Sequence, residues 1–497
     1  MIVYLAGMII IGFSVSRRNA SVGDFYLGGR TLGPLVTAMS AEASDMSSYL
    51  LMGLPGLAYL TGMADVGWTI IGLALGTYLN WLFVAKPLRR YTEITGSITL
   101  PSFFSNRYKD KGNILTLLAS IIIIIFFVPY TASGFAACGK LFNSLFNANY
   151  HVAMIISAIV IILYTCMGGF LAASITDLIQ SIVMTIALVI VLFFGVRTAG
   201  GMGAVMENAR SLAGYFTLTA THDPVSKTAS PYGFITIIST MAWGLGYFGM
   251  PHILLRFMAI EDEKKIPLSR RIASIWVVVA MAVAMFIGMV GLAMTNAGHV
   301  PALEGSASET IIVEISSLLS KNGFFFALVA GIVLSGILAS TMSTSDSQLL
   351  AASSAISNDL LSKFFHVKME EKKLLLIARL SLVVIAIIGV VLAWNPDSSV
   401  FMIVSFAWAG FGAAFGPVIL LALFWKRSNL YGAVAGMVSG GVMIFVWKFM
   451  VRPMGGAWNI YELLPAFLVA IIVNVIVSLV TPAPGKAIEA EFDRVHR

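Results

Sequence analysis

The fold of this chain is decided by one stretch of sequence, Ala41-Glu42-Ala43-Ser44-Asp45-Met46-Ser47-Ser48-Tyr49-Leu50-Leu51-Met52-Gly53-Leu54-Pro55-Gly56. It lies in a largely apolar segment, 34–60, that is long enough to cross a bilayer, yet it carries carboxylates, hydroxyls, glycines and a proline. Irregular backbone at membrane depth is tolerated only where it is buried in protein or lines a wet cavity. The stretch therefore predicts a membrane helix that is broken near mid-membrane.

Composition places this broken helix in a polytopic membrane protein. Of the 497 residues, 58% are apolar and 11% are charged, whereas a soluble domain carries about 25% charged residues. Mean hydropathy is +0.91. These values exclude a soluble enzyme, a disordered chain and a nucleic-acid binder. The only two cysteines, Cys138 and Cys166, are too few for a disulfide framework and are expected to be small buried hydrophobes.

Thirteen segments are apolar enough to be membrane spans, each of which needs about 20 residues. They are 1–14, 34–60, 65–86, 114–142, 150–170, 174–196, 233–258, 272–295, 323–350, 375–394, 398–425, 430–450 and 459–481. The first is short, so it is either tilted or mismatched, or the chain begins inside it. It has no small-residue cleavage site and is not interpreted as a signal peptide.

A second span with an interrupted helix, 233–258, lies five spans after the span at 34–60. It contains Trp243-Gly244-Leu245-Gly246-Tyr247-Phe248-Gly249-Met250-Pro251-His252, and so many glycines with a proline will not form a regular helix cheaply. Two broken helices of opposite direction are typical of an inverted five-plus-five repeat whose site lies between them. The alternative is a pair of proline kinks in ordinary helices. The repeat interpretation divides the chain into 1–33 (peripheral first helix and loop), 34–196 (first repeat), 197–232 (extracellular loop), 233–427 (second repeat) and 428–497 (two peripheral helices and a short tail).

Lys and Arg residues predict the orientation of the chain. With the N-terminus outside and the loop at Arg17 and Arg18 in the cytoplasm, the inner segments hold 21 Lys or Arg residues and the outer segments hold seven. This bias follows the positive-inside rule and explains the formal net charge of +7. An odd number of spans then puts the C-terminus in the cytoplasm. The expected location is the plasma membrane.

The ninth span carries a polar patch close to one end. It reads Ser335-Gly336-Ile337-Leu338-Ala339-Ser340-Thr341-Met342-Ser343-Thr344-Ser345-Asp346-Ser347-Gln348. Neighbouring hydroxyls at Ser343 and Thr344 can face one hard cation such as Na⁺, by analogy with other oxygen-ligand sites. The alternative is that these hydroxyls bond back to their own helix or join helices together.

Acidic residues inside spans are costly, so a functional role is the default interpretation. The inner acids are Asp45, Asp177 and Asp346; the last two lie near span ends, where capping or pairing is an equal alternative. His252 is either a proton carrier or, more in keeping with a lone histidine, a hydrogen-bonded packing residue. Trp243 and Tyr247 are spaced as on one face of a helix, which usually indicates buried core residues. Because they lie beside a break, their rings also fit a position over a cavity.

The quoted stretches, together with Gly28-Gly29-Arg30-Thr31-Leu32-Gly33-Pro34, resemble the sodium:solute symporter family over nearly the whole chain. The stretch from Trp243 to Met258 is similar to the branch of that family that transports L-proline with Na⁺. The resemblance implies an all-α protein of thirteen transmembrane helices with a LeuT-like inverted-repeat core, Na⁺ as the coupling ion and L-proline as substrate. It implies membrane lipid as surroundings, no nucleic acid and no obligatory protein partner.

The resemblance also implies site residues by motif position. The sodium ligands fall on Ala43, Met46, Ser340, Ser343 and Thr344, and the substrate contacts on Ser47, Tyr49, Gly53, Tyr130, Trp243, Tyr247 and Pro251. Supporting groups, or a second cation site, fall on Asp45, Asp177, Asp346 and Ser347. Two positions depart from the pattern: Tyr49 stands where the branch has Trp, and Ser340 stands where the family usually has Ala, a change that a carbonyl ligand survives.

Other functions are open at this point. A different small solute (another amino acid, a vitamin or a carboxylate) would use the same sodium site. A transporter-like sensor or a membrane enzyme is a different class, but six histidines and two cysteines assemble no metal or nucleophile constellation within the spans. The sequence thus favours a sodium-coupled importer, not an enzyme.

Overall fold

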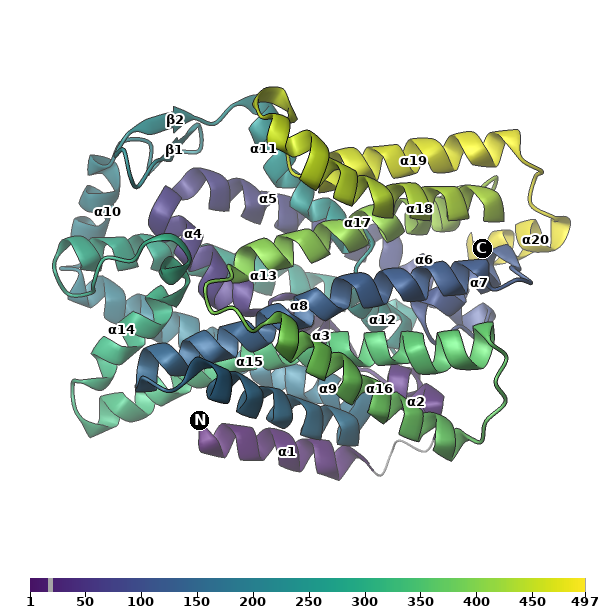
Figure 1. Ribbon diagram of the computed structural model, residues 1–497, viewed down its shortest axis with the longest axis horizontal. Helices are drawn as coiled ribbons and strands as arrows, with labels where there is room; N and C mark the ends of the chain where they lie inside the picture. The colour runs from purple at the N-terminus through teal and green to yellow at the C-terminus, as the bar shows by residue number, and fades with distance from the viewer. Residues whose placement is uncertain (17–20, 497) are drawn as a thin grey trace.

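A computed structural model describes residues 1–16 and 21–496. It is a bundle of long helices whose axes run mostly across the view, with the N- and C-termini toward opposite ends (Figure 1). Of the described residues, nine helices are long and apolar enough to cross a membrane. Shorter apolar helices occupy Val3–Val15, Tyr49–Thr61 and Phe234–Phe248. Only a short two-stranded hairpin interrupts this all-helical architecture in the described part of the chain.

Helices and the two strands follow one another along the chain in a simple order. They are α1 (Ile2–Ser16), α2 (Val22–Leu27), η1 (Gly28–Arg30), α3 (Pro34–Asp45), η2 (Tyr49–Gly53), α4 (Leu54–Thr61), α5 (Met63–Leu79), η3 (Asn80–Val84), α6 (Ala85–Ile94), α7 (Leu100–Tyr108), α8 (Ile114–Phe146), α9 (Tyr150–Thr198), α10 (Met202–Ser211), β1 (Ala220–His222), β2 (Ala229–Pro231), α11 (Phe234–Met241), η4 (Ala242–Phe248), α12 (Pro251–Ala259), η5 (Glu263–Lys265), α13 (Ile266–Asn296), η6 (Gly305–Thr310), α14 (Ile311–Ser320), α15 (Phe324–Ser354), η7 (Ala355–Phe364), α16 (Glu371–Leu392), α17 (Val400–Phe424), α18 (Leu430–Val446), η8 (Trp447–Val451), η9 (Arg452–Met454), η10 (Gly456–Trp458), α19 (Leu463–Val480) and α20 (Lys486–His496).

The predicted spans differ from the observed helices in two ways: two spans form one helix, and two others are divided. The spans at 150–170 and 174–196 form the single element α9, which changes direction at Gly169 (φ 60°, ψ −160°). Only glycine adopts such a conformation cheaply, so a kink replaces the expected loop. The spans at 34–60 and 233–258 are divided into short pieces. Length alone therefore gives nine crossing helices in the described chain and does not by itself reproduce the count of thirteen.

The first predicted break lies directly after α3. The helix ends at Asp45, and Met46 takes a non-helical conformation (φ −72°, ψ 70°). Helical structure resumes as the widened turn η2 and continues into α4. Pro55 follows the widened turn and has no N–H to donate to the helix that continues through it. Loss of the regular ladder at this point frees backbone carbonyls at the end of α3.

The second predicted break lies between η4 and α12. Gly249 and the extended Met250 (φ −75°, ψ 110°) separate the two elements, and Pro251 opens α12. A proline at a helix start has the fixed φ that the first turn requires. Both broken spans that the sequence predicts are thus present, and the alternative of two kinked but continuous helices is wrong.

The two broken spans run in opposite directions. Leu32, just before α3, forms a bridge with Ile260, just after α12. The Leu32 N–H donates to the Ala259 carbonyl (3.2 Å), and the Glu261 N–H donates to the Leu32 carbonyl (3.0 Å). Since α3 leads away from this point and α12 leads to it, the two helices are antiparallel, and they pack against each other. This is the arrangement that an inverted repeat requires.

The remaining segments hold short elements, and one cysteine differs from the sequence analysis. The segment 197–232 holds the short helix α10 and the hairpin β1–β2. The tail forms α20, which buries Phe492 and Val495 against the protein. Cys138 is buried as expected, but Cys166 is partly exposed, because this turn of α9 lies at the surface of the bundle.

Close backbone contact fixes the second break against α5. A Cβ added at Gly244 would lie 2.1 Å from the Gly72 carbonyl oxygen, and one added at Gly76 would lie 2.3 Å from the Gly244 carbonyl oxygen. No side chain fits there without moving backbone. The glycines of the quoted stretch therefore serve helix packing as well as unwinding.

We expect Gly244→Ala to destabilise the protein by about 1–3 kcal/mol, the usual cost of overpacking. Thermal unfolding of the detergent-solubilised protein, followed by tryptophan fluorescence, measures this. Gly331→Ala in α15 is the matched control, since nothing lies within 4 Å of a Cβ added there, and alanine should be neutral or slightly stabilising in a helix. Equal melting temperatures for the two variants would contradict the packing argument.

Candidate functional site

The predicted sodium ligands lie where α15 crosses the end of α3. The Ser343 hydroxyl donates to the carbonyl of Ala43 (2.8 Å) and lies 3.2 Å from the carbonyl of Ser340. The Thr344 hydroxyl donates to the same Ser340 carbonyl (3.3 Å). Met46 is the C-cap of α3. The structure thus gathers the five predicted residues, which we call the hydroxyl–carbonyl cluster, from two elements 300 positions apart.

The chemistry of this cluster fits a small hard cation. All five residues are buried, and carbonyl and hydroxyl oxygens are ligands that such cations prefer. The C-terminal end of α3 adds the negative end of a helix dipole. The structure also supports part of the alternative, because the hydroxyls of Ser343 and Thr344 do bond to carbonyls. One of those bonds joins two different helices, so the same oxygens can turn toward one ion.

The predicted substrate contacts surround the two breaks and are buried. The rings of Tyr49 and Trp243 are 6.4 Å apart, and the Tyr49 hydroxyl donates to the sulfur of Met46 (3.1 Å). A Cβ added at Gly53 would lie 3.3 Å from the ring of Phe401 and 3.3 Å from the Tyr49 Cβ. The backbone at this break is therefore approached closely by the ring of Phe401. The tyrosine that departs from the family pattern faces Trp243 across the break.

Three other predicted contacts come from the breaks and from α8. Ser47 lies at the first break, and its N–H donates to the Asp45 carbonyl (2.7 Å). Tyr130 on α8 is buried, with its hydroxyl near Ser47. Pro251 opens α12 at the second break. The predicted residues thus converge from three separate parts of the chain.

Sequence reasoning missed the aromatic residues that support the second break. The indole N–H of Trp408 on α17 donates to the Trp243 carbonyl (2.7 Å), and Gly246 leaves room for that indole. The Trp243 ring stacks on Tyr461 at 5.3 Å and lies 5.3 Å from Phe401. Nothing in their local sequence separates these residues from ordinary core, since they act only through long-range packing.

Asp45 joins the two broken helices directly. The Tyr247 hydroxyl donates to its Oδ2 (2.5 Å), while Oδ1 is buried and has no hydrogen-bond partner among the described residues. Nearby Glu42 accepts from Thr77 (3.0 Å) and from the indole of Trp81 (2.9 Å). The bond to Tyr247 fits the supporting role that the family resemblance implies for Asp45, because it braces the break. Its unpartnered Oδ1 is also compatible with a role beside a cation.

Asp177 and Asp346 belong to a network centred on a residue that the sequence analysis left unassigned, Arg256 of α12. Its guanidinium donates to Asp177 Oδ2 (3.1 Å) and to Ser347 Oγ (2.6 Å). Asp346 accepts from the hydroxyls of Tyr164 (2.8 Å) and Ser347 (3.0 Å). The signal in the sequence was a charged residue only four positions after His252 in an apolar run. The pairing alternative therefore describes Asp177, whereas Asp346 is held by hydroxyl groups.

His252 differs from the expectation of a hydrogen-bonded packing residue. Its side chain is fully buried, and both ring nitrogens lack a hydrogen-bond partner among the described residues. The ring packs 5.6 Å from that of Phe127. A packing role remains, but the hydrogen-bonding part of that expectation is wrong.

Comparisons with known proteins agree with this architecture. The sequence profile described as "Sodium:solute symporter family" matches residues 25–440. A protein named sodium/proline symporter from Staphylococcus aureus is 41% identical over 500 residues, covering 99% of this chain and 94% of the relative. The protein of the same name from S. aureus strain USA300 / TCH1516 is 42% identical over 501 residues, with the same coverage. The chain belongs to the sodium:solute symporter family.

Solved structures show the same fold. A Na⁺-coupled sialic acid symporter, in a substrate-bound outward-open state, superposes with a TM-score of 0.78 at 17% identity, covering 97% of each chain. Mhp1, a nucleobase-cation-symport-1 family transporter in a closed conformation, gives 0.57 at 14% identity, with 94% of this chain and 98% of Mhp1 covered. The predicted LeuT-like, all-α transporter fold is confirmed. The protein is accordingly a multi-pass membrane transporter.

We expect Ser343→Ala and Thr344→Ala each to raise the Na⁺ concentration for half-maximal uptake by at least about tenfold, by comparison with the loss seen when residues around other metal sites are changed. Uptake of labelled solute into proteoliposomes over a Na⁺ series measures this. Ser335→Ala is the control, because among the described residues the Ser335 hydroxyl bonds to the Gly331 carbonyl of the same helix and to no predicted sodium ligand. Unchanged Na⁺ dependence in both variants would remove these hydroxyls from the site.

Proposed function

We propose that the protein is a secondary active importer that moves L-proline with Na⁺ by alternating access. The observation that carries the proposal is the hydrogen bond between Ser343 and the freed carbonyl of Ala43 (2.8 Å). It lies at a broken helix of a chain 41–42% identical to proteins named sodium/proline symporter. That contact brings together, at the first break, the oxygens that a hard cation needs.

Sodium ordering is the first step of the proposed mechanism. The ion takes the carbonyls of Ala43, Met46 and Ser340 and the hydroxyls of Ser343 and Thr344, and thereby joins α3 to α15. Fixing the end of α3 also fixes Ser47 and Tyr49, which follow it directly. Coupling is reciprocal, so an ion that tightens substrate binding is itself bound more tightly when substrate is present.

Proline would bind between the two breaks. Its carboxylate meets the free N–H groups of a half-helix N-terminus, where the dipole favours negative charge. Its ring packs on Trp243, Tyr247 and Tyr130, and its ammonium gains attraction from the ring faces. Gly53 and Pro251 shape the rest of the space together with the ring of Tyr49. Closely packed aromatic walls favour a small compact solute.

The energetics allow accumulation with one Na⁺ per substrate. A membrane potential supplies about 2.3 kcal/mol per charge per 100 mV. Since a tenfold ratio costs about 1.4 kcal/mol, one charge moved through 100 mV supports a roughly 45-fold gradient before any sodium gradient is added. No nucleotide is required for uptake on this scale.

We expect purified protein to bind labelled L-proline more tightly with Na⁺ than with choline, because the ion orders the substrate residues. A typical coupling of 1–3 kcal/mol corresponds to about 5- to 150-fold in affinity. Equal affinities would contradict the ordering. Competition by other amino acids, vitamins and carboxylates is the specificity control, and a solute that displaces proline at lower concentration than proline itself would reassign the substrate.

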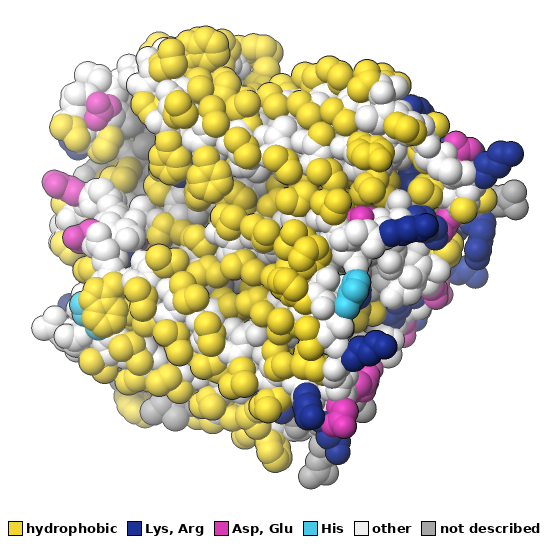
Figure 2. Space-filling model, turned by 45° about the vertical axis from the view of Figure 1, so that its right-hand side comes forward, with side chains coloured by type: hydrophobic (Ala, Val, Ile, Leu, Met, Phe, Trp, Pro, Cys, Tyr) yellow, Lys and Arg dark blue, Asp and Glu magenta, His cyan; other side chains and the backbone are white. Residues whose placement is uncertain are grey.

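The proposed orientation places the N-terminus outside the cell, the C-terminus in the cytoplasm and the protein in the plasma membrane. Lys and Arg side chains gather along one edge of the molecule (Figure 2), and the two termini lie toward opposite ends (Figure 1). Lys86, Arg90 and Lys426 are among the residues that support this assignment. Arg17, Arg18 and Arg497, which also contribute to it, lie outside the described residues.

We expect an epitope added after residue 496 to be hidden in intact cells and accessible in inside-out vesicles, because the proposed topology puts this end of the chain in the cytoplasm. The matched control is the same epitope in the turn at 223–228 of the hairpin loop, which should be accessible in intact cells. The reverse pattern would invert the topology.

A further inference from the structure

The network around Arg256 lies next to the hydroxyl–carbonyl cluster and is fully enclosed. The exposed fraction is 1% for Arg256 and 0% for Asp177 and Asp346. Ser347 links the network to the cluster, because its hydroxyl oxygen lies 3.0 Å from the Ser343 carbonyl and accepts from Arg256 (2.6 Å). A fixed positive charge thus stands about one helical turn from the proposed sodium ligands.

The guanidinium occupies an oxygen-lined position where four helices meet. It donates to Ser40 Oγ of α3 (3.0 Å), Asp177 Oδ2 of α9 (3.1 Å), Ser347 Oγ of α15 and the His252 carbonyl of α12 (2.9 Å). Hydroxyls, a carboxylate and a carbonyl are also the ligands of a hard metal cation. These oxygen atoms therefore have the composition of a cation site, but the Arg256 guanidinium occupies it.

This charge is permanent, and it is already paired with one oxygen of Asp177. An arginine is not deprotonated in proteins, and a buried acid is tolerated when it is paired and hydrogen-bonded. Ser40 also donates to Asp177 Oδ2 (2.6 Å), and the ring of Phe170 lies 4.9 Å from the guanidinium carbon. Asp177 Oδ1 is buried and has no hydrogen-bond partner among the described residues, but a second Na⁺ that used Ser40 Oγ, Asp177 Oδ2 and Ser347 Oγ would have to displace the guanidinium, which would also repel it.

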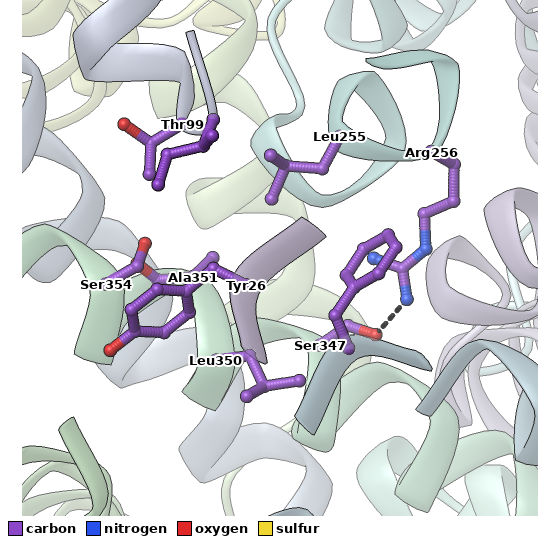
Figure 3. Close-up of a pocket in the computed structure, with 10 residues that line it drawn as sticks. Tyr26, Thr99, Leu255, Arg256, Ser347, Leu350, Ala351 and Ser354 are labelled. Carbon is purple, nitrogen blue, oxygen red and sulfur yellow. Dashed lines mark hydrogen bonds between the residues drawn. The ribbon is translucent and has the colours of Figure 1, made fainter. Parts of the chain in front are cut away.

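Figure 3 shows Arg256 beside a small cavity. Arg256 and Ser347, joined by their hydrogen bond, form one side of this cavity of about 10 Å³, which Tyr26, Thr99 and Ser354 also line. That volume suits a single water and not a hydrated ion.

We propose that Arg256 is a tethered cation that takes the place of a second Na⁺, so that the chain binds a single Na⁺ per transport cycle. The inference rests on the sodium site put forward under the proposed function. It assigns Asp177 and Ser347, which the sequence analysis associated with a second cation, to an arginine of the protein itself. Arg256 is a positioning residue, since it acts by occupying the oxygen ligands of a possible cation site and does not contact the substrate.

The test is equilibrium binding of radioactive Na⁺ to purified, monodisperse protein. We expect one ion per wild-type chain and two per chain for Arg256→Gln, with a steeper dependence on Na⁺ concentration, because the freed acids and hydroxyls can then hold an ion. Arg256→Lys should bind one ion. The double variant Asp177→Asn/Arg256→Gln, which lacks the acid as well, should also bind one. Arg107→Gln, at another fully buried arginine outside this network, controls for loss of buried charge and should bind one.

Two ions in the wild-type chain, or one ion in folded Arg256→Gln, would overturn the proposal. If Arg256→Gln does not fold, Asp177→Asn in an otherwise unchanged chain decides the matter. We expect it to retain one ion with affinity within about twofold of wild type, because Asp177 is not a ligand of the transported ion; a loss of about tenfold or more would refute the proposal. An absence of Na⁺ binding to the wild-type chain would instead reject the sodium site of the proposed function.

Discussion

The structure depends on backbone groups released in the middle of two membrane helices and then held by distant side chains. Where α3 ends at Asp45, its last carbonyls lose their partners within the helix. An unsatisfied backbone group in a hydrocarbon surrounding costs several kcal/mol, so the break persists only if other elements compensate. Ser343 bonds to the Ala43 carbonyl (2.8 Å), and Tyr247 bonds to the Asp45 carboxylate (2.5 Å).

The same contacts relate structure to transport. The hydrogen bonds from α15 and η4 to the end of α3 join the two inverted repeats. An ion or solute bound at the breaks therefore changes how the two repeats contact each other. An ion coordinated by both Ser343 and Ala43 would replace their hydrogen bond and so change the contact between α15 and α3 directly. In the proposed function, ion and substrate share the segment at residues 43–53, and this shared segment would couple their binding.

Charge is distributed so that the interior supports a single transported cation. Arg256 lies between Ser40, Asp177 and Ser347 and neutralises an acid that would otherwise attract an ion. Asp45 keeps one carboxylate oxygen without a partner among the described residues, close to the first break. Asp177 also keeps one such oxygen, so the two acids differ in their partners: Asp177 is paired with Arg256, whereas Asp45 accepts from Tyr247 at the first break.

The sequence by itself determined the membrane class, the two breaks and the residue types at them. Clusters of glycine, proline and hydroxyl residues at 41–56 and 243–252 disrupt a helix through local propensity, which needs no knowledge of neighbours. Tertiary structure alone decided which groups meet: Trp408 against Trp243, Tyr247 on Asp45, and Arg256 between Asp177 and Ser347. These partners lie between 79 and 202 positions apart. No local sequence pattern predicts these contacts, because the partner of a buried side chain is determined by the folding of distant segments.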